Sequence, residues 1–308
     1  MQEPRKKVRF MVNAKSGTRW SFDALRRAVD ESWESAGHVV SYQFSQSTED
    51  GVEKARQAVA DGIDIIMVAG GDGTVNTVAR ELIGSPVVLG IVPVGSGNGF
   101  ARHFGIPLVP RKAVAALADA FVKPVDVGMV NETPFFVTCS MAWDASIAEA
   151  FARSPVRGIL PYVLAGVQQF FDYIPQDVRV DIDDKESLFF AEPIIFTVAN
   201  ISQFGGGAII APQAKADDGW LELVVALRRD AAMLLANLPR LFNGTLHQIP
   251  EVTTRHFRKL KITRPHATPL QIDGELVQAD ANVRVRVHEQ RLRVLVPNKN
   301  MSGKPLEP

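Results

Sequence analysis

Two short apolar runs, each followed by glycines and then by a helical pattern, constrain the fold of this chain more than any other feature. The first run is DIIMVAG, which ends at Gly70, and the second is VVLGIVPV, which ends at Val94. Apolar runs of this length are typical of strands that are buried on both faces, as in a parallel sheet covered by helices. The sequence therefore predicts an α/β arrangement in this part of the chain.

The same alternation extends over the first 120 residues. Further strand-like segments lie at residues 8–13 and 38–45, and helical patterns lie at 22–33, 52–60 and 74–83. Ser21 is placed to cap the first of these helices, and Gly37 is placed to end it. Strands that alternate with helices at this spacing predict a parallel sheet with helices on both faces.

The pattern changes near residue 125. Strand-like segments now dominate, and many of them alternate with a period of two, as antiparallel strands with one buried face do. They are PFFVTCS, DVRVDID, PIIFTVAN, WLELVVAL, KLKIT, PLQID and NVRVRVH. Two helical patterns interrupt them, around residues 158–173 and 231–241. We therefore expect an α/β domain at 1–125 and a mainly antiparallel β domain at 126–289. A last strand, at about 290–300, could belong to either domain.

Composition narrows the range of partners. The chain has 308 residues and a formal net charge of +0, which removes the general electrostatic attraction to nucleic acid. No apolar run approaches the ~20 residues that a membrane helix needs, so we expect any contact with a membrane to be made from its surface. Cys139 is the only cysteine, so the chain cannot form an intrachain disulfide. This is consistent with a protein of the reducing cytoplasm. Cys139 lies in a strand-like run, where a buried, inert thiol is expected.

Three loops rich in glycine and hydroxyl residues, at 13–17, 70–77 and 95–99, follow predicted strands. In parallel α/β sheets, ligands bind beyond the carboxyl ends of the strands. Glycines there allow close approach of the backbone, and a helix N-terminus favours anions. Asp72 would repel a bare phosphate, which suggests a Mg²⁺-nucleotide or a sugar hydroxyl. Each loop alone could be only a tight turn, and neither a Walker A pattern nor G-x-G-x-x-G is present.

At these loops the chain resembles the diacylglycerol kinase catalytic-domain family, which includes bacterial lipid kinases and sphingosine kinases. Residues 70–76 match its GGDGT(x)N signature, residues 93–98 are similar to its P-x-G-[ST]-x-N loop, and residues 13–17 are similar to its N-P-x-S-G loop. VDVG, AWDA, FGGGAIIAPQAKADDGWLEL and IDGE are similar to later family elements, in the same order. NAD kinases and phosphofructokinases also carry a GGDGT-like element, but the D-G-x-L and D-G-E elements favour the lipid kinases.

The chain departs from the family pattern at a few positions. Ala14 stands in place of proline, Gly99 in place of aspartate, and Ala142-Trp143 in place of Gly-Phe. The loop sequence GSGN is closer to that of the sphingosine kinases. None of these departures removes a residue to which the resemblance assigns chemistry. They do leave the identity of the lipid substrate open.

The resemblance implies a nucleotide-binding domain of the NAD kinase and phosphofructokinase type, with ATP and Mg²⁺ as cofactors. The residues that it assigns to nucleotide binding are Asn13, Ala14, Lys15, Ser16, Gly17, Thr48, Gly70, Gly71, Asp72, Gly73, Thr74, Val75, Asn76, Thr77, Gly95, Ser96 and Asn98. Asp72 would also be catalytic and would lie near the metal. A positioned hydroxyl nucleophile and neutralised phosphate charge are what phosphoryl transfer requires.

The resemblance also assigns roles in the second domain. Glu275 would be the general base that accepts the proton of the lipid hydroxyl, although QIDGELV is equally a strong type I′ hairpin signal. A structural Mg²⁺ would be held by the Asp218 side chain and by backbone oxygens of Lys215 and Trp220, which are ligands that suit a hard cation. Asp126 would join an acidic network between that metal and the active site. On the pattern alone, Asp126 is a cap or turn residue.

We therefore expect an ATP-dependent lipid kinase that phosphorylates a hydroxyl of a diacylglycerol-like or sphingoid lipid. It would be cytoplasmic and would act at a membrane surface. One alternative is an NAD kinase-like enzyme, which would need no lipid. Another is a non-catalytic protein that binds nucleotide or lipid. A homodimer is compatible with the sequence.

Overall fold

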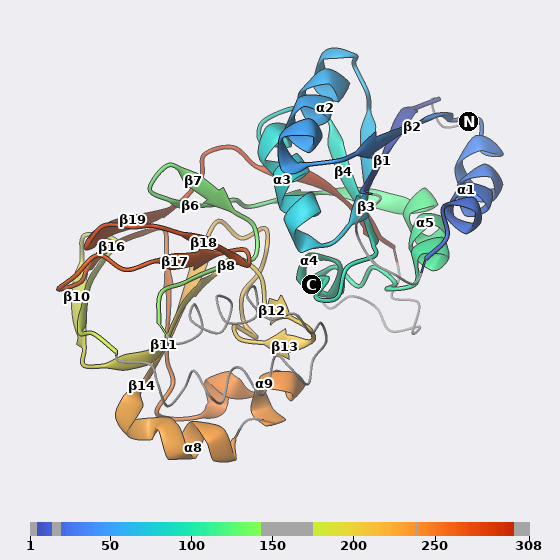
Figure 1. Cartoon of the computed structure of the whole chain (residues 1–308). Helices are drawn as coiled ribbons and strands as arrows, with labels where there is room; N and C mark the ends of the chain where they lie inside the picture. Colours follow the sequence, from blue (N-terminus) through green and yellow to red (C-terminus); the bar gives the residue numbers. More distant parts are fainter. Residues whose placement is uncertain (1–4, 14–19, 143–174, 238, 299–308) are drawn as a thin grey trace. The chain divides into compact units, whose positions relative to one another are not determined.

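A computed structural model describes residues 5–13, 20–142, 175–237 and 239–298 of the chain (Figure 1). The chain divides into two compact units. The first contains residues 1–125 and 290–308, and the second contains residues 126–289. The helix predicted around residues 158–173 lies outside the described residues.

Six strands form the sheet of the first unit. Their order across the sheet is β2 (Val39–Ser45), β1 (Lys7–Asn13), β3 (Ile65–Gly70), β4 (Val88–Pro93), β20 (Leu292–Pro297) and β5 (Ala120–Val125). The first five are parallel neighbours, and β5 is antiparallel to β20. β3 and β4 are buried along their whole length, which is why they read as apolar runs. The predicted parallel sheet is confirmed.

Helices cover both faces of this sheet (Figure 1). On one face, α1 (Phe22–Val29) packs against α5 (Pro110–Ala118). On the other, α2 (Thr48–Ala60) packs against α3 (Asp72–Leu82), and the short α4 (Gly99–His103) follows β4. α1 continues as a π-helix over Asp30–Glu34, and its buried Trp33 donates Nε1–H to the Val114 carbonyl at 3.0 Å. This bond joins the two helices of one face.

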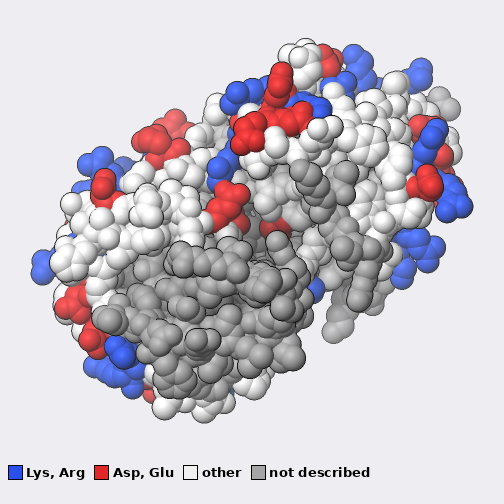
Figure 2. Space-filling model, viewed as in Figure 1, with Lys and Arg blue, Asp and Glu red and all other residues white. Residues whose placement is uncertain are grey.

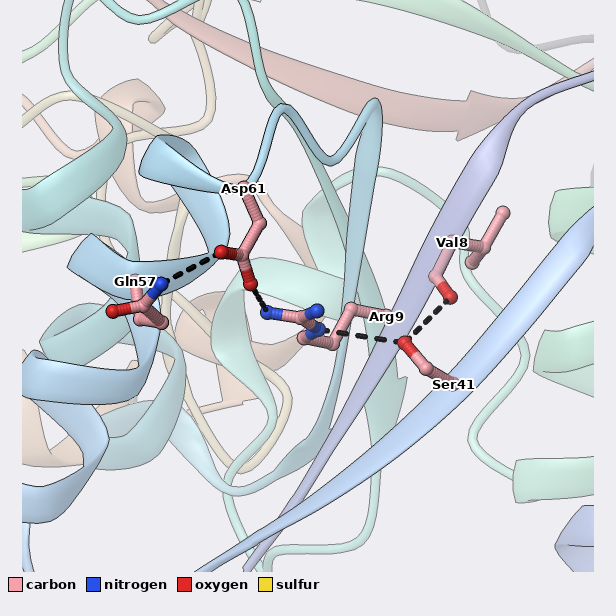
Figure 3. A network of polar contacts seen from close by, with 5 residues as sticks. All are labelled: Val8, Arg9, Ser41, Gln57 and Asp61. Carbon is pink, nitrogen blue, oxygen red and sulfur yellow. Dashed lines mark hydrogen bonds and ion pairs between the residues drawn. The ribbon is translucent and has the colours of Figure 1, made fainter.

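A polar network ties the end of α2 to the first strands of the sheet (Figure 3). Arg9 on β1 donates to Asp61 Oδ2 at 2.8 Å and to Ser41 Oγ on β2 at 3.4 Å. Gln57 on α2 donates to the other oxygen of Asp61 at 2.6 Å. Arg9 thus connects the end of α2 with the neighbouring strand β2. Because Arg9 lies in the first half of β1, this network is distant from the carboxyl ends of the strands.

The second unit is built on two antiparallel sheets of six strands each. The first sheet has the order β10 (Glu186–Phe190), β9 (Val178–Ile182), β16 (Lys259–Thr263), β19 (Asn282–Val287), β6 (Gly128–Val130) and β7 (Thr133–Phe135). The second has the order β15 (Thr253–Phe257), β14 (Leu221–Leu227), β11 (Pro193–Ala199), β8 (Thr138–Ser140), β17 (Leu270–Ile272) and β18 (Glu275–Val277). The predicted antiparallel β domain is confirmed.

The two sheets pack face to face. One apolar core contains side chains from both, among them Val180 and Ile262 of the first sheet and Phe196, Leu223 and Cys139 of the second. A second apolar cluster lies on the other face of the second sheet, where residues of α8 (Ala231–Ala236) and α9 (Pro239–Asn243) pack on it. Cys139 is buried, as its position in the sequence predicted, and as the single cysteine it forms no intrachain disulfide. The described part of the unit also contains a small hairpin of β12 (Gln203–Gly205) and β13 (Ala208–Ile209), and 3₁₀ turns at Arg228–Asp230 and Leu246–Gln248.

One predicted strand is wrong. PFFVTCS was expected to form a single strand, but it forms the end of β7 and the whole of β8, which belong to different sheets. The break falls at Phe136 and Val137, whose backbone N–H groups donate to the carboxylate of Asp273 instead of to a neighbouring strand. A side chain that is distant in sequence thus takes the hydrogen bonds of the strand.

The surface shows no strong bias of charge on the face in view. Lys and Arg side chains are interspersed there with Asp and Glu (Figure 2), as the formal net charge of +0 leads one to expect. Among the helices of the described residues, none is both long and apolar enough to span a bilayer.

Candidate functional site

The carboxyl ends of four adjacent parallel strands lie along one edge of the first sheet. β2, β1, β3 and β4 are neighbours there, and the segments that follow them begin at Gln46, Ala14, Gly71 and Val94. This edge is where parallel α/β sheets bind their ligands. The topology therefore brings the end of β1, the glycine loops after β3 and β4, and the start of α2 to one edge. Residues 14–17, including the predicted Ala14, Lys15, Ser16 and Gly17, lie outside the described residues.

The turn between β3 and α3 places a helix N-terminus at this edge. β3 ends at Gly70, Gly71 is the N-cap with an extended backbone (φ −90°, ψ −179°), and α3 begins at Asp72. A Cβ on Gly70 would lie 2.6 Å from Cβ of Thr74, so glycine is required there. Thr74 Oγ1 accepts a hydrogen bond from Asn13 Nδ2 at 2.9 Å, which links the end of β1 to the first turn of α3. The first N–H groups of α3 have no partner within the helix, and so this turn suits an anion.

The loops after β3 and β4 touch backbone to backbone. A Cβ on Gly95 would lie 2.6 Å from Cα of Gly71, and a Cβ on Gly71 would lie 3.3 Å from Cα of Gly95. The N–H of Val94 donates to the carbonyl of Gly70 at 3.1 Å. Glycine is thus required at both positions, because no side chain fits between the two loops. The backbones of the two loops are therefore in direct contact at the start of α3.

Asn98 and Arg102 fix the shape of the second loop. Asn98 lies in the left-handed region (φ 51°), which asparagine tolerates, and its Nδ2 donates to the carbonyl of Gly95 at 2.8 Å. Arg102 Nε donates to the carbonyl of Gly97 at 3.0 Å. Ser96 is exposed between them. Two side chains therefore hold the carbonyls of this loop, and Arg102 was not predicted from the sequence.

The Asp72 carboxylate joins the two loops. It is hydrogen-bonded by the backbone N–H groups of Phe100, Asn98 and Gly99, at the start of α4. Burial raises the pKa of Asp72 above its ordinary value, while these hydrogen bonds and the nearby charge of Arg102 oppose that rise. Asp72 was predicted to lie near a metal. The structure places its carboxylate on the amides of the second loop, where it holds the two loops together.

The other residues that were predicted to contact the nucleotide differ in their exposure to solvent. Thr48 is exposed at the first position of α2, next to the end of β2. Val75 and Asn76 are buried in α3, at 5% exposure each. Thr77 is half-buried, and its Oγ1 donates to the carbonyl of Gly73 within the helix at 2.9 Å. Thr48 and Gly73 thus offer exposed atoms near the edge, whereas Val75 and Asn76 face the protein interior.

In the second unit, the predicted catalytic Glu275 follows a tight turn between β17 and β18. Asp273 (φ 49°) and Gly274 (φ 92°) both have positive φ, as a type I′ turn requires, and Ile272 pairs with Glu275 across it. The hairpin interpretation of QIDGELV is therefore confirmed. Glu275 is exposed. The Asp273 carboxylate accepts three backbone N–H groups, from Phe136 and Val137 at 2.8 Å each and from Thr138 at 3.0 Å.

The predicted metal residues lie on the turn that leads into β14. Asp218 Oδ1 accepts the N–H of Trp220 at 3.0 Å, and both residues are exposed, as is Lys215. One carboxylate and two backbone carbonyls form an all-oxygen donor set, which fits Mg²⁺. Over the described ranges, no three His, Cys, Asp or Glu side chains are grouped closely enough to hold a metal by themselves. The site would therefore depend on backbone oxygens.

Asp126 stabilises this turn through two hydrogen bonds. It is 1% exposed, its Oδ2 accepts the N–H of Gly219 at 2.6 Å, and its own N–H donates to the carbonyl of Ala216 at 2.6 Å. Asp126 was predicted either to join an acidic network or to act as a turn residue. Its hydrogen bonds with Gly219 and Ala216 are those of a residue that fixes the 216–219 turn.

A buried carboxylate lies just beyond the turn. Glu222, the second residue of β14, is 1% exposed, and its Oε2 lies 3.7 Å from Nε2 of His256 on β15. Burial raises the pKa of Glu222; His256 opposes this rise, and the charge of Asp218 adds to it. Glu222 was not predicted from the sequence, because a lone glutamate in an apolar strand carries no distinctive signal.

Comparison with known families agrees with this architecture. Residues 7–130 match the family model described as "Diacylglycerol kinase catalytic domain", and residues 138–296 match "YegS C-terminal NAD kinase beta sandwich-like domain". The two matches together cover almost all of both units. Fold and site therefore define a class of two-domain proteins, with a glycine-loop α/β domain and a β sandwich of the NAD kinase type.

Individual relatives support the same class. A Chromohalobacter salexigens protein described as "Probable lipid kinase YegS-like" is 32% identical over 282 residues, which is 86% of this chain and 85% of the relative. The diacylglycerol kinase of Bacillus subtilis is 28% identical over 278 residues, covering 88% and 90% of the two chains. The crystal structure of a diacylglycerol kinase from Bacillus anthracis superposes with a TM-score of 0.74 at 18% identity, over 97% of this chain and 98% of that one, and shows a shared fold. The chain belongs to the diacylglycerol kinase catalytic-domain family of lipid kinases.

Proposed function

We propose that this protein is an ATP-dependent lipid kinase that transfers the γ-phosphate of ATP to a hydroxyl of a diacylglycerol-like or sphingoid lipid. The observation that carries the proposal is the contact of Gly71 with Gly95 at the start of α3, in a chain of the diacylglycerol kinase family. Relatives named diacylglycerol kinase cover most of its length. The proposal places the lipid at a membrane surface, which the protein reaches from the cytoplasm.

The first unit would bind and position the nucleotide. Phosphoryl transfer depends on positioning and on charge stabilisation more than on covalent chemistry of the protein. The N–H groups at the start of α3 are aimed at the strand edge and can donate to phosphate oxygens. The absence of side chains at Gly71 and Gly95 leaves room for that approach. Mg²⁺ bound with the nucleotide would neutralise part of the phosphate charge.

Asp72 would keep this phosphate surface in shape. Its carboxylate is hydrogen-bonded to amides of the second loop, so it holds that loop against the first. Near the bound nucleotide, the same carboxylate would face the metal that accompanies the phosphates. Thr48, Thr74 and Ser96 lie near the same strand edge and could contact other parts of the nucleotide.

Glu275 would accept the proton of the lipid hydroxyl. A general base must reach the hydroxyl within hydrogen-bond distance, and an exposed carboxylate on a rigid turn meets that requirement. The turn is rigid because Asp273 is bonded to three amides of the neighbouring segment. A structural Mg²⁺ would be held by Asp218 and by carbonyls of Lys215 and Trp220, and would stiffen the 215–220 turn.

The test is transfer of labelled γ-phosphate from ATP in the presence of Mg²⁺. The acceptors are diacylglycerol, monoacylglycerol, ceramide, sphingosine and phosphatidylglycerol in mixed micelles, and NAD without lipid. Glu275→Gln is compared with Glu251→Gln, which changes another exposed glutamate of the same unit in the same way. We expect one lipid to be labelled, and the labelling to fall by about 10²-fold or more in Glu275→Gln only. Labelling of NAD alone would assign the protein to the NAD kinases, and binding of ATP with no acceptor labelled would contradict the proposal.

A further inference from the structure

The segment between β7 and β8 is held from two sides. On one side, the N–H groups of Phe136 and Val137 donate to the carboxylate of Asp273, at 2.8 Å each. On the other side, their carbonyls accept hydrogen bonds from a single residue, Asn200. Its Nδ2 donates to the carbonyl of Phe136 at 3.1 Å, and its backbone N–H donates to the carbonyl of Val137 at 3.0 Å. The two peptide groups therefore lie between Asp273 and Asn200.

The Asn200 side chain is also linked, through Asp126, to the turn that carries Asp218. Its Nδ2 donates a second hydrogen bond, to the carbonyl of Asp126 at 2.7 Å. The Asp126 carboxylate in turn accepts the N–H of Gly219 at 2.6 Å. One amide group, on a residue that is 0% exposed, thus joins the Asp273–Glu275 turn to the Asp126–Gly219 contact.

The chemistry of these partners fixes the orientation of the amide. Both acceptors are carbonyl oxygens, so the NH₂ group must face them and the Oδ1 atom must point away. A carboxylate of the same shape would place oxygen against oxygen at both contacts. A methyl group would leave two buried carbonyls without their donor, a loss that the surrounding backbone can relieve only by moving. Asparagine is therefore the residue type that this position requires.

We infer that Asn200 is a positioning residue for phosphoryl transfer, which acts through Glu275. This inference rests on the proposed function. Asn200 holds residues 136 and 137 in the conformation that receives Asp273, and Asp273 holds the turn from which Glu275 projects. A displacement of about 1 Å at a catalytic group can lower a rate about 10²-fold, so a residue without contact to the substrate can set the rate in this way.

The first test compares Asn200→Ala with Ser140→Ala. Ser140 is also 0% exposed, and its hydroxyl shares a hydrogen bond with Thr197 Oγ1 at 3.2 Å between β8 and β11, so its loss removes a buried hydrogen bond in the same sheet. We expect Asn200→Ala to lower kcat by about 10- to 100-fold with KM for ATP changed less than about threefold. Ser140→Ala should leave kcat near the wild-type value. Equal kcat values in the two variants would overturn the inference.

The second test is a double-mutant comparison with Glu275→Gln. If Asn200 acts by placing Glu275, then Asn200→Ala should lower the residual rate of Glu275→Gln by no more than about threefold. Effects that multiply would show that Asn200 acts elsewhere, and would overturn the inference. If Asn200→Ala does not fold, Asn200→Ser, which keeps a small buried donor, is used in the same comparisons.

The third test does not depend on activity. Amide exchange is measured by NMR on the full chain, and the amides of Phe136, Val137 and Thr138 report on the contact with Asp273. We expect them to exchange about tenfold faster or more in Asn200→Ala and at the wild-type rate in Ser140→Ala. Unchanged exchange would overturn the inference. If the wild-type protein labels no lipid, the proposed function fails, and this measurement alone decides whether Asn200 positions the turn.

Discussion

Gly95 and Gly73, which lie in the glycine loops after β4 and β3, lack a side chain for different reasons. A Cβ on Gly95 would meet the backbone of Gly71 at 2.6 Å, whereas a Cβ on Gly73 would meet nothing within 4 Å. Gly95 is therefore needed by the protein itself. Gly73 sits in the first turn of α3, where the fold would accept alanine, so the proposed approach of a phosphate gives the reason for a glycine there.

We expect Gly95→Ala and Gly73→Ala to separate these tasks. Gly95→Ala should lower the free energy of unfolding by about 1–3 kcal/mol, because the two loops must move apart. Gly73→Ala should leave stability unchanged or raise it by up to about 1 kcal/mol, since alanine favours a helix. Both should weaken ATP binding. The measurements are urea unfolding and calorimetric titration with ATP, and full ATP affinity in Gly73→Ala would contradict the assigned phosphate surface.

Asp273 and Asp183, two of the three aspartates with positive φ in the described part of the chain, provide a matched pair. Asp273 accepts three backbone N–H groups, and Asp183 (φ 50°) accepts two, from Arg258 and Lys259. We expect Asp273→Asn and Asp183→Asn each to lower the free energy of unfolding by about 1–3 kcal/mol, because a carboxylate that accepts several bonds is replaced by an amide. Only Asp273→Asn should lower the rate of lipid phosphorylation. Equal activity in the two variants would show that the Asp273 turn has no part in catalysis.

At the scale of elements, the Arg9–Asp61 contact makes the attachment of α2 to β1 dependent on pH (Figure 3). Hydrogen bonds from Arg9 and Gln57 hold the pKa of Asp61 below its ordinary value of 3.8. The folded chain therefore binds this proton more weakly than the unfolded chain does. The resulting stabilisation is present above pH 3.8 and is lost as the pH falls through the pKa of the folded state.

We expect Asp61→Asn to remove this part of the acid sensitivity. Its urea midpoint should fall less steeply than that of the wild type as the pH is lowered from 5 to below 3.8. Glu31→Gln, which changes an exposed carboxylate of the helical segment 30–34, should keep the wild-type slope. Parallel curves for wild type and Asp61→Asn would refute the role given to the contact.

Much of the element pattern could be read from the sequence, because the strongest signals were local. The runs that became β3 and β4 are buried on both faces, and Asp273-Gly274 forms the turn that its residue types favour. Helix α2 begins at Thr48, one turn before the predicted Val52, since Ser47 accepts the N–H of Asp50 and caps it there. The break in PFFVTCS could not be read, because it is caused by Asp273, which is more than a hundred residues away.

The candidate site was predicted less completely than the fold. The glycine loops were found because glycine at a strand end is a local signal. The bonds from the amides of residues 98–100 to Asp72, and the role of Asn200, depend on loops that meet only in the folded protein. A polar residue that ends the apolar run PIIFTVAN was the one available hint of Asn200.

At the scale of the whole molecule, the first unit is discontinuous in sequence. β20 follows all of residues 126–289 and then inserts between β4 and β5, with Leu292, Val294, Leu295 and Val296 buried (Figure 1). The sequence left the position of this strand open, because an apolar alternating run fits either sheet type. Its place follows from its pairing with β4 and β5.

We expect a chain that stops at Glu289 to lose the fold of the first unit and to bind no ATP, since β4 and β5 would have no strand between them. A chain that stops at Asn298, and so keeps β20, should behave as the full chain does. Limited proteolysis with mass spectrometry measures this: in the shorter chain, cleavage should concentrate within residues 1–125. Equal protease resistance of residues 1–125 in the two chains would show that β20 is dispensable.

The position of β20 also has a consequence for synthesis in the cell. At about 5–20 residues per second, the ribosome spends on the order of ten seconds or more on residues 126–289 before β20 emerges. During that time the nascent chain already contains β4, buried along its whole length in the finished protein, but not the strand that covers its edge. Most of the first unit is translated before the second, yet its fold can be completed only after the second unit has been translated. The first unit is therefore the one that a chaperone would need to protect.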